Sequence, residues 1–319
     1  MNKSFPLWLR GVLVFAIVIV VLMAVCSPLQ YYYGIWGLLA TEVILLAITL
    51  TAAVACKIPI KEMLPAKAPR LGQIIGVVVM CAAGIVFAAC SNFIMFFFFP
   101  QSMQLVDEFS NLYKSAPGVV TWLIIALSPA VCEETLHRGF ILYTFKNSGF
   151  RSKWFIVIWM GLIFGAFHMD PIRFAATCIL GMILTYVALE SGNILLPVIY
   201  HMLNNSLSVI AGLTFSTDES LSMSQVLSSS IMPSLIGTMF IMSAIALYLL
   251  RLGARMVGAR KPALSTLSPD PDYERIRASH RKTLYITVFA SIILFVAGIF
   301  LIYQTMLNTP PLFDEILTM

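Results

Sequence analysis

Charged residues are scarce in this 319-residue chain: Asp, Glu, Lys and Arg make up 11% of it, against about 25% in soluble globular domains. Hydrophobic residues make up 60%, and the mean hydropathy is +0.92. A soluble domain of this size needs a charged exterior, so the composition excludes a soluble globule, a disordered chain and a fibrous protein. The composition fits a protein whose solvent is lipid.

Cysteine pairs with metal-binding spacing are missing as well. The sequence has no CxxC pair and no HExxH motif, and its six cysteines all fall in apolar segments. They are typical of small core residues, and not of a disulfide framework or a zinc knuckle. The chain also lacks a stripe of basic residues of the kind that binds nucleic acid, so we expect no nucleic-acid partner.

Long apolar windows fill most of the chain. A helix needs about 20 apolar residues to cross about 30 Å of hydrocarbon. Because lipid offers no hydrogen bonds to a bare backbone, such windows must be helices. The sequence therefore predicts an all-α fold, a polytopic bundle of about nine transmembrane helices. The expected spans are 11–27, 31–56, 71–99, 118–143, 154–169, 174–190, 194–212, 231–250 and 283–306.

The basic residues are distributed unevenly between the two ends of these spans. With the N-terminus inside, 17 of the 20 lysines and arginines fall on the cytoplasmic side, which is the positive-inside pattern. The polar, basic stretch 251–282 is then a cytoplasmic linker between an eight-span body and a last helix. The chain divides into N-terminal transmembrane helices (1–117), a core (118–212) and C-terminal helices (213–319), all in contact with membrane lipid.

Ionisable residues are concentrated in the fourth span, where lipid makes them costly and where they are usually functional. The segment 132–139 has the sequence CEETLHRG. On a helix, Glu134 and Arg138 are four residues apart and can form an ion pair. Glu133 points about 100° away, on the face of His137, where it is left to meet water or substrate as a general base or acid. A structural salt-bridge network in a transporter is the alternative interpretation.

Two further polar motifs lie in later spans. His168 ends the sequence FGAFH, and a histidine at a helix end is either a capping or interface residue or a catalytic group. His201 and Asn205 share one helical face. Asparagine in a span either links helices by hydrogen bonds or donates to a developing oxyanion. Glu42, in the second span, is an isolated carboxylate outside these motifs.

In combination, these motifs resemble those of the CPBP family of intramembrane endopeptidases, the CAAX proteases and bacteriocin-processing enzymes also called the Abi family. The family pattern is EExxxR, FxxxH and HxxxN on separate membrane helices. Order and spacing agree throughout, and the lead-in SGNILLPVIYH to the third motif is also similar. One departure is His137, which stands where the family usually has phenylalanine. The matching residues, all within the 118–212 core, are Glu133, Glu134, Arg138, Phe164, His168, His201 and Asn205.

The resemblance implies that peptide bonds are hydrolysed inside the membrane. The catalytic residues it implies are Glu133 and His168, which activate water, and His201 and Asn205, which stabilise the oxyanion. The supporting residues are Glu134, Arg138 and His137. We expect a metal-free mechanism without a cofactor; zinc held by Glu133, His168 and His201 is the alternative, because a carboxylate and two imidazoles are a known ligand set of catalytic zinc. The expected substrate is a membrane-associated peptide or protein: a CAAX-like tail, a bacteriocin leader or a propeptide.

The residues leave two other functions open. An ion-coupled transporter uses buried carboxylates as a relay, and Glu42 favours this function, but the sequence lacks the inverted repeats and broken helices typical of such transporters. A non-catalytic bacteriocin-immunity scaffold would keep the fold, although the intact catalytic residues argue against it. The uninterrupted spans and the lack of organelle signals indicate a bacterial plasma membrane, which the chain crosses many times.

Overall fold

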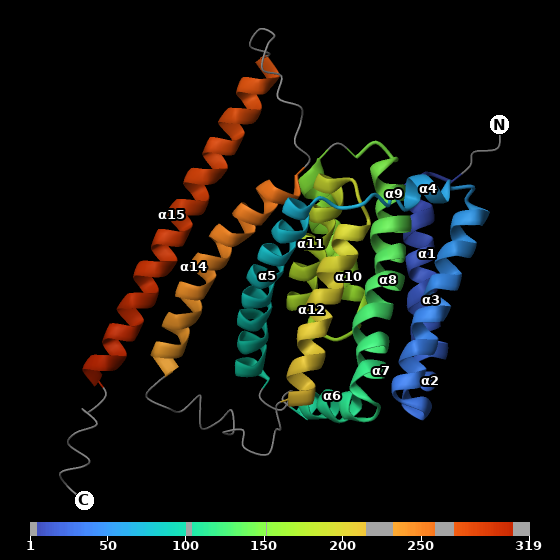
Figure 1. The fold of residues 1–319 in the computed structure, drawn as a ribbon, viewed down its shortest axis with the longest axis horizontal. Helices are drawn as coiled ribbons and strands as arrows, with labels where there is room; N and C mark the ends of the chain where they lie inside the picture. Colours follow the sequence, from blue (N-terminus) through green and yellow to red (C-terminus); the bar gives the residue numbers. More distant parts are fainter. Residues whose placement is uncertain (1–4, 100–103, 151, 215–231, 259–270, 309–319) are drawn as a thin grey trace, which may run out of the picture.

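The computed structural model describes residues 5–99, 104–150, 152–214, 232–258 and 271–308. All regular structure in these ranges is helical, and the helices stand side by side (Figure 1). This arrangement confirms the all-α transmembrane bundle predicted from the apolar windows.

The N-terminal helices form one flank of the bundle. The first spans Leu7–Tyr33 without a break and consists of α1 (Leu7–Val21), a π-helical turn (Leu22–Cys26) and α2 (Ser27–Tyr33). Gly34, whose φ of 54° favours glycine, connects it to α3 (Ile35–Ala55). The short α4 (Ile60–Met63) lies at the end of the bundle that holds the N-terminus, and α5 (Leu71–Phe98) crosses back (Figure 1).

The helix that contains the fourth predicted span is interrupted by two π-helical turns. It runs from Gly118 to Lys146 and is built from α7 (Gly118–Trp122), η3 (Leu123–Leu127), α8 (Ser128–Glu134), η4 (Thr135–Ile141) and α9 (Leu142–Lys146). Such π turns are often found at functional sites, because they change the direction in which side chains point. Before it, α6 (Gln104–Lys114) lies across the end of the bundle opposite α4 (Figure 1).

The remaining helices pack around this one. They are α10 (Lys153–Phe167), α11 (Phe174–Ser191), α12 (Leu195–Thr214), α14 (Met232–Val257) and α15 (Pro271–Asn308). A glycine brings α10 and α11 close together: a Cβ at Gly181 would lie 2.7 Å from Phe164 Cβ and 3.0 Å from Gly161 Cα. Because Phe164 packs with α5, α11 and α12, while Phe167 packs with α1, α3 and η4, α10 contributes to both apolar clusters of the core.

Each of the nine predicted windows falls mainly on one of these helices, although 31–56 begins in α2 and crosses Gly34 before it enters α3. Seven of the described helical segments are long and apolar enough to cross a membrane. The other two windows correspond to α10, which has 15 residues, and to α12, which has 20 residues and carries the polar third motif.

The predicted linker is shorter than the sequence indicated. Much of 251–282 is helical, because α14 continues to Val257 and α15 begins at Pro271, and residues 259–270 lie outside the described residues. Arg251 and Arg255 stay within α14 because long side chains can carry their charge to the membrane surface while their helix continues.

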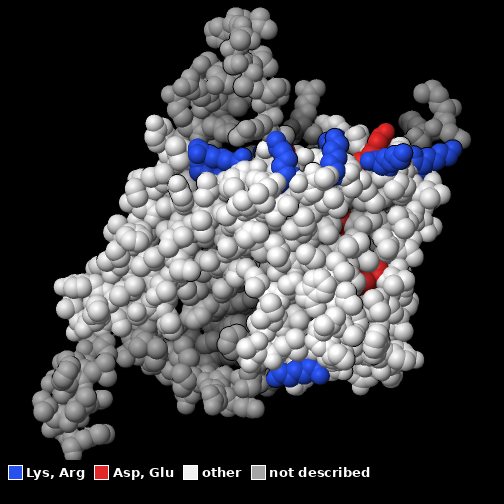
Figure 2. Space-filling model, in the orientation of Figure 1, with Lys and Arg blue, Asp and Glu red and all other residues white. Residues whose placement is uncertain are grey.

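Lysine and arginine gather along one edge of the molecule (Figure 2). This edge is the end at which α4 lies in Figure 1. Such a concentration at one end is the pattern expected for the cytoplasmic side.

We predict that the cytoplasmic side can be identified by cysteine labelling of two exposed lysine positions. Lys67→Cys, next to α4, should react with a membrane-impermeant maleimide only after the cells are permeabilised. Lys114→Cys, at the end of α6, should react in intact cells, and the unsubstituted protein supplies the background from its own cysteines. If Lys67→Cys instead reacts in intact cells and Lys114→Cys reacts only after permeabilisation, the end of the bundle at α4 is the outer side.

Candidate active site

A buried carboxylate on α8 accepts two charge-assisted hydrogen bonds. Glu134 Oε1 accepts from Arg138 Nη1 at 2.8 Å and from His201 Nδ1 at 2.9 Å. The side chains of Glu134 and Arg138 are fully buried. The structure thus contains the ion pair inferred from the spacing, and it joins α8 to α12 through His201 as well.

Arg138 extends this network to two further helices. Its Nη2 donates to the backbone oxygen of Gly181 on α11 at 2.9 Å. Its guanidinium carbon lies 4.5 Å from the centre of the Phe164 ring on α10, a cation–π contact. One arginine therefore contacts α8, α10 and α11, which fixes the positions of these helices around the site.

Glu133 and His137 take no part in this ion pair. Glu133 is 7% exposed, and no described residue is a hydrogen-bond partner of its Oε2. His137 Nδ1 donates to the backbone oxygen of Glu133 at 2.8 Å, because a carbonyl can only accept. The imidazole of His137 is therefore buried beside the site. The carboxylate of Glu133 is available for chemistry.

His168 follows the last residue of α10, and one of its ring nitrogens forms a hydrogen bond within the protein. Its Nδ1 donates to the backbone oxygen of Phe164 at 2.8 Å. In the neutral ring, the hydrogen is then on Nδ1 and the lone pair is on Nε2, which is the arrangement of a base or hydrogen-bond acceptor. The side chain is half-buried.

Phe164 is the residue around which the three motifs assemble. The centre of its ring lies 5.0 Å from that of His137, 4.9 Å from that of His168 and 5.8 Å from that of His201. Phe164 is itself fully buried. Phe164 belongs to the second motif of the sequence, and its contacts with the three rings show that it also spaces the histidines.

The two polar residues of the third motif bond different partners. His201 bonds Glu134, whereas Asn205 Nδ2 donates to the backbone oxygen of Ile125 in η3 at 3.1 Å. Asn205 therefore links two helices, the alternative that the sequence left open. An amide group has two N–H hydrogens, and this bond uses one of them.

Glu42 is the residue that the motifs did not find. It is 7% exposed on α3, a helix that packs against α8 and η4. The available signal was its presence in an apolar span, since an ionisable residue there is usually functional.

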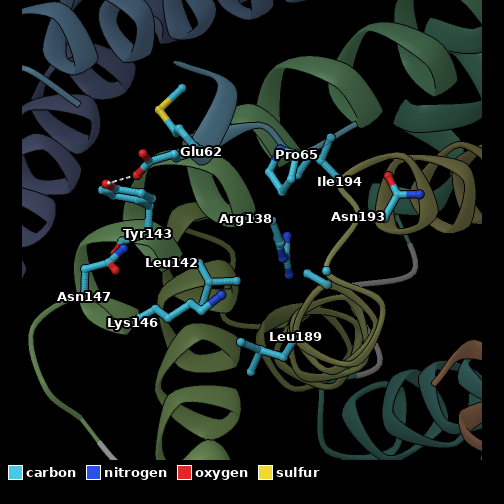
Figure 3. Close-up of a pocket in the computed structure, with 13 residues that line it drawn as sticks. Glu62, Pro65, Arg138, Leu142, Tyr143, Lys146, Asn147, Leu189, Asn193 and Ile194 are labelled. Atoms are coloured by element: carbon cyan, nitrogen blue, oxygen red, sulfur yellow. Dashed lines mark hydrogen bonds between the residues drawn. The ribbon is translucent and has the colours of Figure 1, made fainter. Parts of the chain in front are cut away.

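A cavity of about 330 Å³ lies at the end of the bundle that carries the basic residues. Figure 3 shows Arg138 in this cavity, with the side chain of Lys146 extending toward it. Tyr143 donates to Glu62 across one side at 3.0 Å. The lining residues are Glu62, Met63, Pro65, Arg138, Leu142, Tyr143, Lys146, Asn147, Ala188, Leu189, Gly192, Asn193 and Ile194.

The ligand set of the zinc alternative is not assembled in the described part of the chain. No group of three or more His, Cys, Asp or Glu side chains there is arranged to hold a metal ion. The Nδ1 bonds of His168 and His201 to protein acceptors leave Nε2 of each ring free, as in many metal-binding histidines, so these bonds do not argue against zinc. The mechanism below uses the chain's own residues, and zinc remains the alternative.

Comparison with known protein families finds a match for the segment that holds these residues. Residues 115–207 match the family described as type II CAAX prenyl endopeptidase Rce1-like. The seven motif residues lie inside this range, which nearly coincides with the predicted core at 118–212. The matching segment is thus similar to a family of prenyl endopeptidases, in agreement with the resemblance that the motifs carry. The seven long apolar helices make the protein a multi-pass membrane protein.

One curated protein also matches this chain. It is an Escherichia coli protein described as an uncharacterized 24.3 kDa protein, and it is 32% identical over 103 residues. The match covers 31% of this chain and 48% of the relative, so the chain spans about half the length of the curated relative. No solved structure matches this chain.

We predict that Glu134→Gln destabilises the protein. The substitution leaves the guanidinium of Arg138 buried without its carboxylate, and breaking such a pair costs about 3–5 kcal/mol. The midpoint of thermal unfolding in detergent measures the loss. Glu190→Gln is the matched control, because the ion pair of Glu190 with Lys153 is partly exposed and should contribute about 1 kcal/mol or less. Equal unfolding midpoints for the two variants would contradict the structural role of Glu134.

Proposed function

We propose that this protein is an intramembrane endopeptidase that hydrolyses a peptide bond in a membrane-associated peptide. The observation that carries the proposal is the assembly of the motifs on α8, α10 and α12 around Phe164, beside the unpartnered carboxylate oxygen of Glu133. Protease chemistry is also that of the family that residues 115–207 match. The candidate substrates are a CAAX-like tail, a bacteriocin leader and a propeptide.

In this mechanism, Glu133 is the general base. It removes a proton from a water molecule while the water oxygen bonds to the scissile carbonyl carbon. His168 Nε2 accepts a hydrogen bond from the second O–H of that water, which keeps its hydrogen, because the bond from Nδ1 to Phe164 leaves the Nε2 lone pair free. When the C–N bond breaks, the proton moves from Glu133 to the leaving amine, which returns Glu133 to its ionised form.

The developing oxyanion is stabilised by donors on α12. Asn205 has a second amide hydrogen beyond the one that it gives to Ile125. His201 donates from Nε2 when its ring carries both hydrogens, and Glu134 balances the charge of that imidazolium through Nδ1. Donors fixed in advance by such bonds need no reorganisation during the reaction.

The peptide enters from the basic end of the bundle. Arg138 lines the cavity at that end and also contacts the ion-pair network of the site, so the cavity leads toward the catalytic residues. Apolar side chains such as Leu142 and Leu189 also line it, which suits a peptide that is partly embedded in lipid.

We predict that Glu133→Gln abolishes turnover and leaves the fold intact, because it removes the base and keeps the shape. Mass spectrometry of membrane peptides from cells that carry wild-type protein or Glu133→Gln should identify fragments present only with the wild type. Glu190→Gln should give the wild-type fragments. Identical fragments from the Glu133→Gln cells would exclude Glu133 as the base.

Asn205→Ala should lower kcat about 100- to 1,000-fold with little change in KM, which is the usual effect of losing one oxyanion donor. The bond to Ile125 is lost as well, so the unfolding free energy should fall by about 1 kcal/mol. Asn205→Asp should be slower still, because it places a carboxylate where negative charge develops. If kcat is near normal in folded Asn205→Ala, the residue only links helices.

Activity should survive removal of metal ions, since the proposed water is activated by Glu133 and His168 alone. Purified protein in lipid nanodiscs would be dialysed against a strong chelator and assayed before and after addition of zinc. Zinc bound near one equivalent, with loss of activity on chelation and recovery on zinc addition, would establish the metal-dependent alternative.

A further inference from the structure

Pro129 interrupts the backbone hydrogen bonds of the fourth span just after η3 ends. It is the second residue of α8, and a proline nitrogen carries no hydrogen to donate. Ser128, directly before it, donates its backbone N–H to the oxygen of Leu123, five residues earlier, as in a π turn. The next N–H in the series is missing. Pro129 therefore gives no bond to Ile125, the residue four positions before it, or to Ile124, five positions before it.

Side chains bond both of these carbonyl oxygens. Ser128 Oγ donates to the oxygen of Ile124 at 2.8 Å, and Asn205 Nδ2, from α12, donates to that of Ile125 at 3.1 Å. Whether the local spacing is that of an α turn or a π turn, the oxygen that Pro129 leaves without its backbone donor is one that a side chain reaches. A proline ring also clashes with the carbonyl four residues earlier, which turns that carbonyl outward from the helix.

The other end of the Asn205 side-chain amide has a partner as well. Asn204 Nδ2 donates to Asn205 Oδ1 at 3.2 Å. An amide whose oxygen accepts one bond and whose nitrogen donates another has a defined orientation, because exchanging the two ends would place its oxygen against the oxygen of Ile125. The second Nδ2 hydrogen of Asn205 therefore has a fixed direction.

A second bond joins the fourth span to α12 beside this one. Trp122 Nε1 donates to Ser206 Oγ at 2.8 Å. Trp122 is about one turn before Ile125, and Ser206 follows Asn205 directly. Losing the bond between Asn205 and Ile125 would thus leave the two helices linked at the same level, so the direction of the carbonyl can be tested without separating the helices.

We propose that Pro129 is a positioning residue for Asn205. By withholding an N–H from the helix, Pro129 leaves the carbonyl of Ile125 turned toward the Asn205 amide. This bond, together with the one from Asn204, aims the second Nδ2 hydrogen at the oxyanion of the substrate. Pro129 itself exchanges no proton and forms no bond with the substrate. The inference rests on the proposed function, since it concerns the residue that donates to the oxyanion.

The activity test restores the missing backbone donor. Pro129→Ala supplies an N–H that can close the helical bond to Ile125 and draw its carbonyl away from Asn205. With KM unchanged, kcat should fall about 10- to 100-fold, because small misplacements of catalytic groups have effects of this size. The probe is a synthetic peptide with a farnesylated cysteine and a CAAX-like tail, presented to the protein in lipid nanodiscs.

The same substitution in an Asn205→Ala background separates positioning from packing. Because the donor that Pro129 positions is then absent, Pro129→Ala should change kcat less than about twofold there. A proline needed only for packing would lower kcat by the same factor in both backgrounds, and that result would overturn the inference.

Pro28→Ala is the matched control, because the first span repeats the local pattern. Ser27 and Pro28 follow the π turn Leu22–Cys26 in the same way as Ser128 and Pro129 follow η3. Pro28 lies in α2, which packs against α3. Its replacement should keep kcat within about twofold of the wild type. A loss as large as that of Pro129→Ala would overturn the inference, since removing a proline from any such turn would then be enough.

A second variant acts on the other end of the Asn205 amide. Asn204→Asp removes the donor to Oδ1 and puts a carboxylate there, which can only accept, so the amide turns its Nδ2 toward residue 204. We expect kcat to fall at least about 10-fold with KM unchanged. Wild-type kcat in either Asn204→Asp or Pro129→Ala would overturn the inference and leave the proposed function in place.

A thermal unfolding cycle in detergent tests the bond without reference to activity. Asn205→Ala should lower the unfolding midpoint by about 2 °C in the wild-type background, where the amide bonds Ile125. In the Pro129→Ala background, where this bond is already lost, the shift should be less than about 1 °C. Equal shifts would overturn the inference even if the protein cleaved no probe peptide. Unequal shifts without cleavage would support the link between Pro129 and Asn205 and count against the proposed function alone.

Discussion

The structure depends on the pairing of charges that lipid cannot solvate. Glu134 is fully buried and tolerable there because Arg138 and His201 both donate to one of its oxygens. Through Arg138, the same carboxylate determines where α11 and the Phe164 ring of α10 can lie. The helices therefore meet in one arrangement, and the polar atoms that do not take part in this pairing are left for chemistry.

Much of this fold can be predicted from the sequence, and the reason is the bilayer. Long apolar windows must become helices in lipid, so each predicted span falls mainly on one observed helix. The pair of Glu134 and Arg138 follows from helical spacing alone. The ends of the C-terminal linker could not be predicted in the same way, because α14 and α15 extend through polar residues that the water interface also accepts.

The details of the site depend on contacts between helices, which periodicity does not reveal. The π turns η3 and η4 each accommodate an extra residue that no spacing rule indicates. The bond from Asn205 to Ile125 requires knowledge of which turn of the fourth span faces α12. Glu42 is the clearest case: as an isolated carboxylate it favoured a transporter, whereas the structure buries it on α3, a helix that packs against α8 and η4.

The short length of α10 has a consequence for the surrounding bilayer. Its 15 residues extend about 22 Å at about 1.5 Å per residue, less than the hydrocarbon thickness of about 30 Å. The helix begins at Lys153, whose charge favours the membrane surface, and from there α10 ends just before His168, short of the opposite surface. Hydrophobic mismatch then favours local thinning of the lipid beside His168 at a modest cost per ångström. A thinner bilayer brings a peptide from the membrane surface closer to His168. The acyl-chain length of the host membrane thus becomes a physical variable to which the depth of this site is coupled.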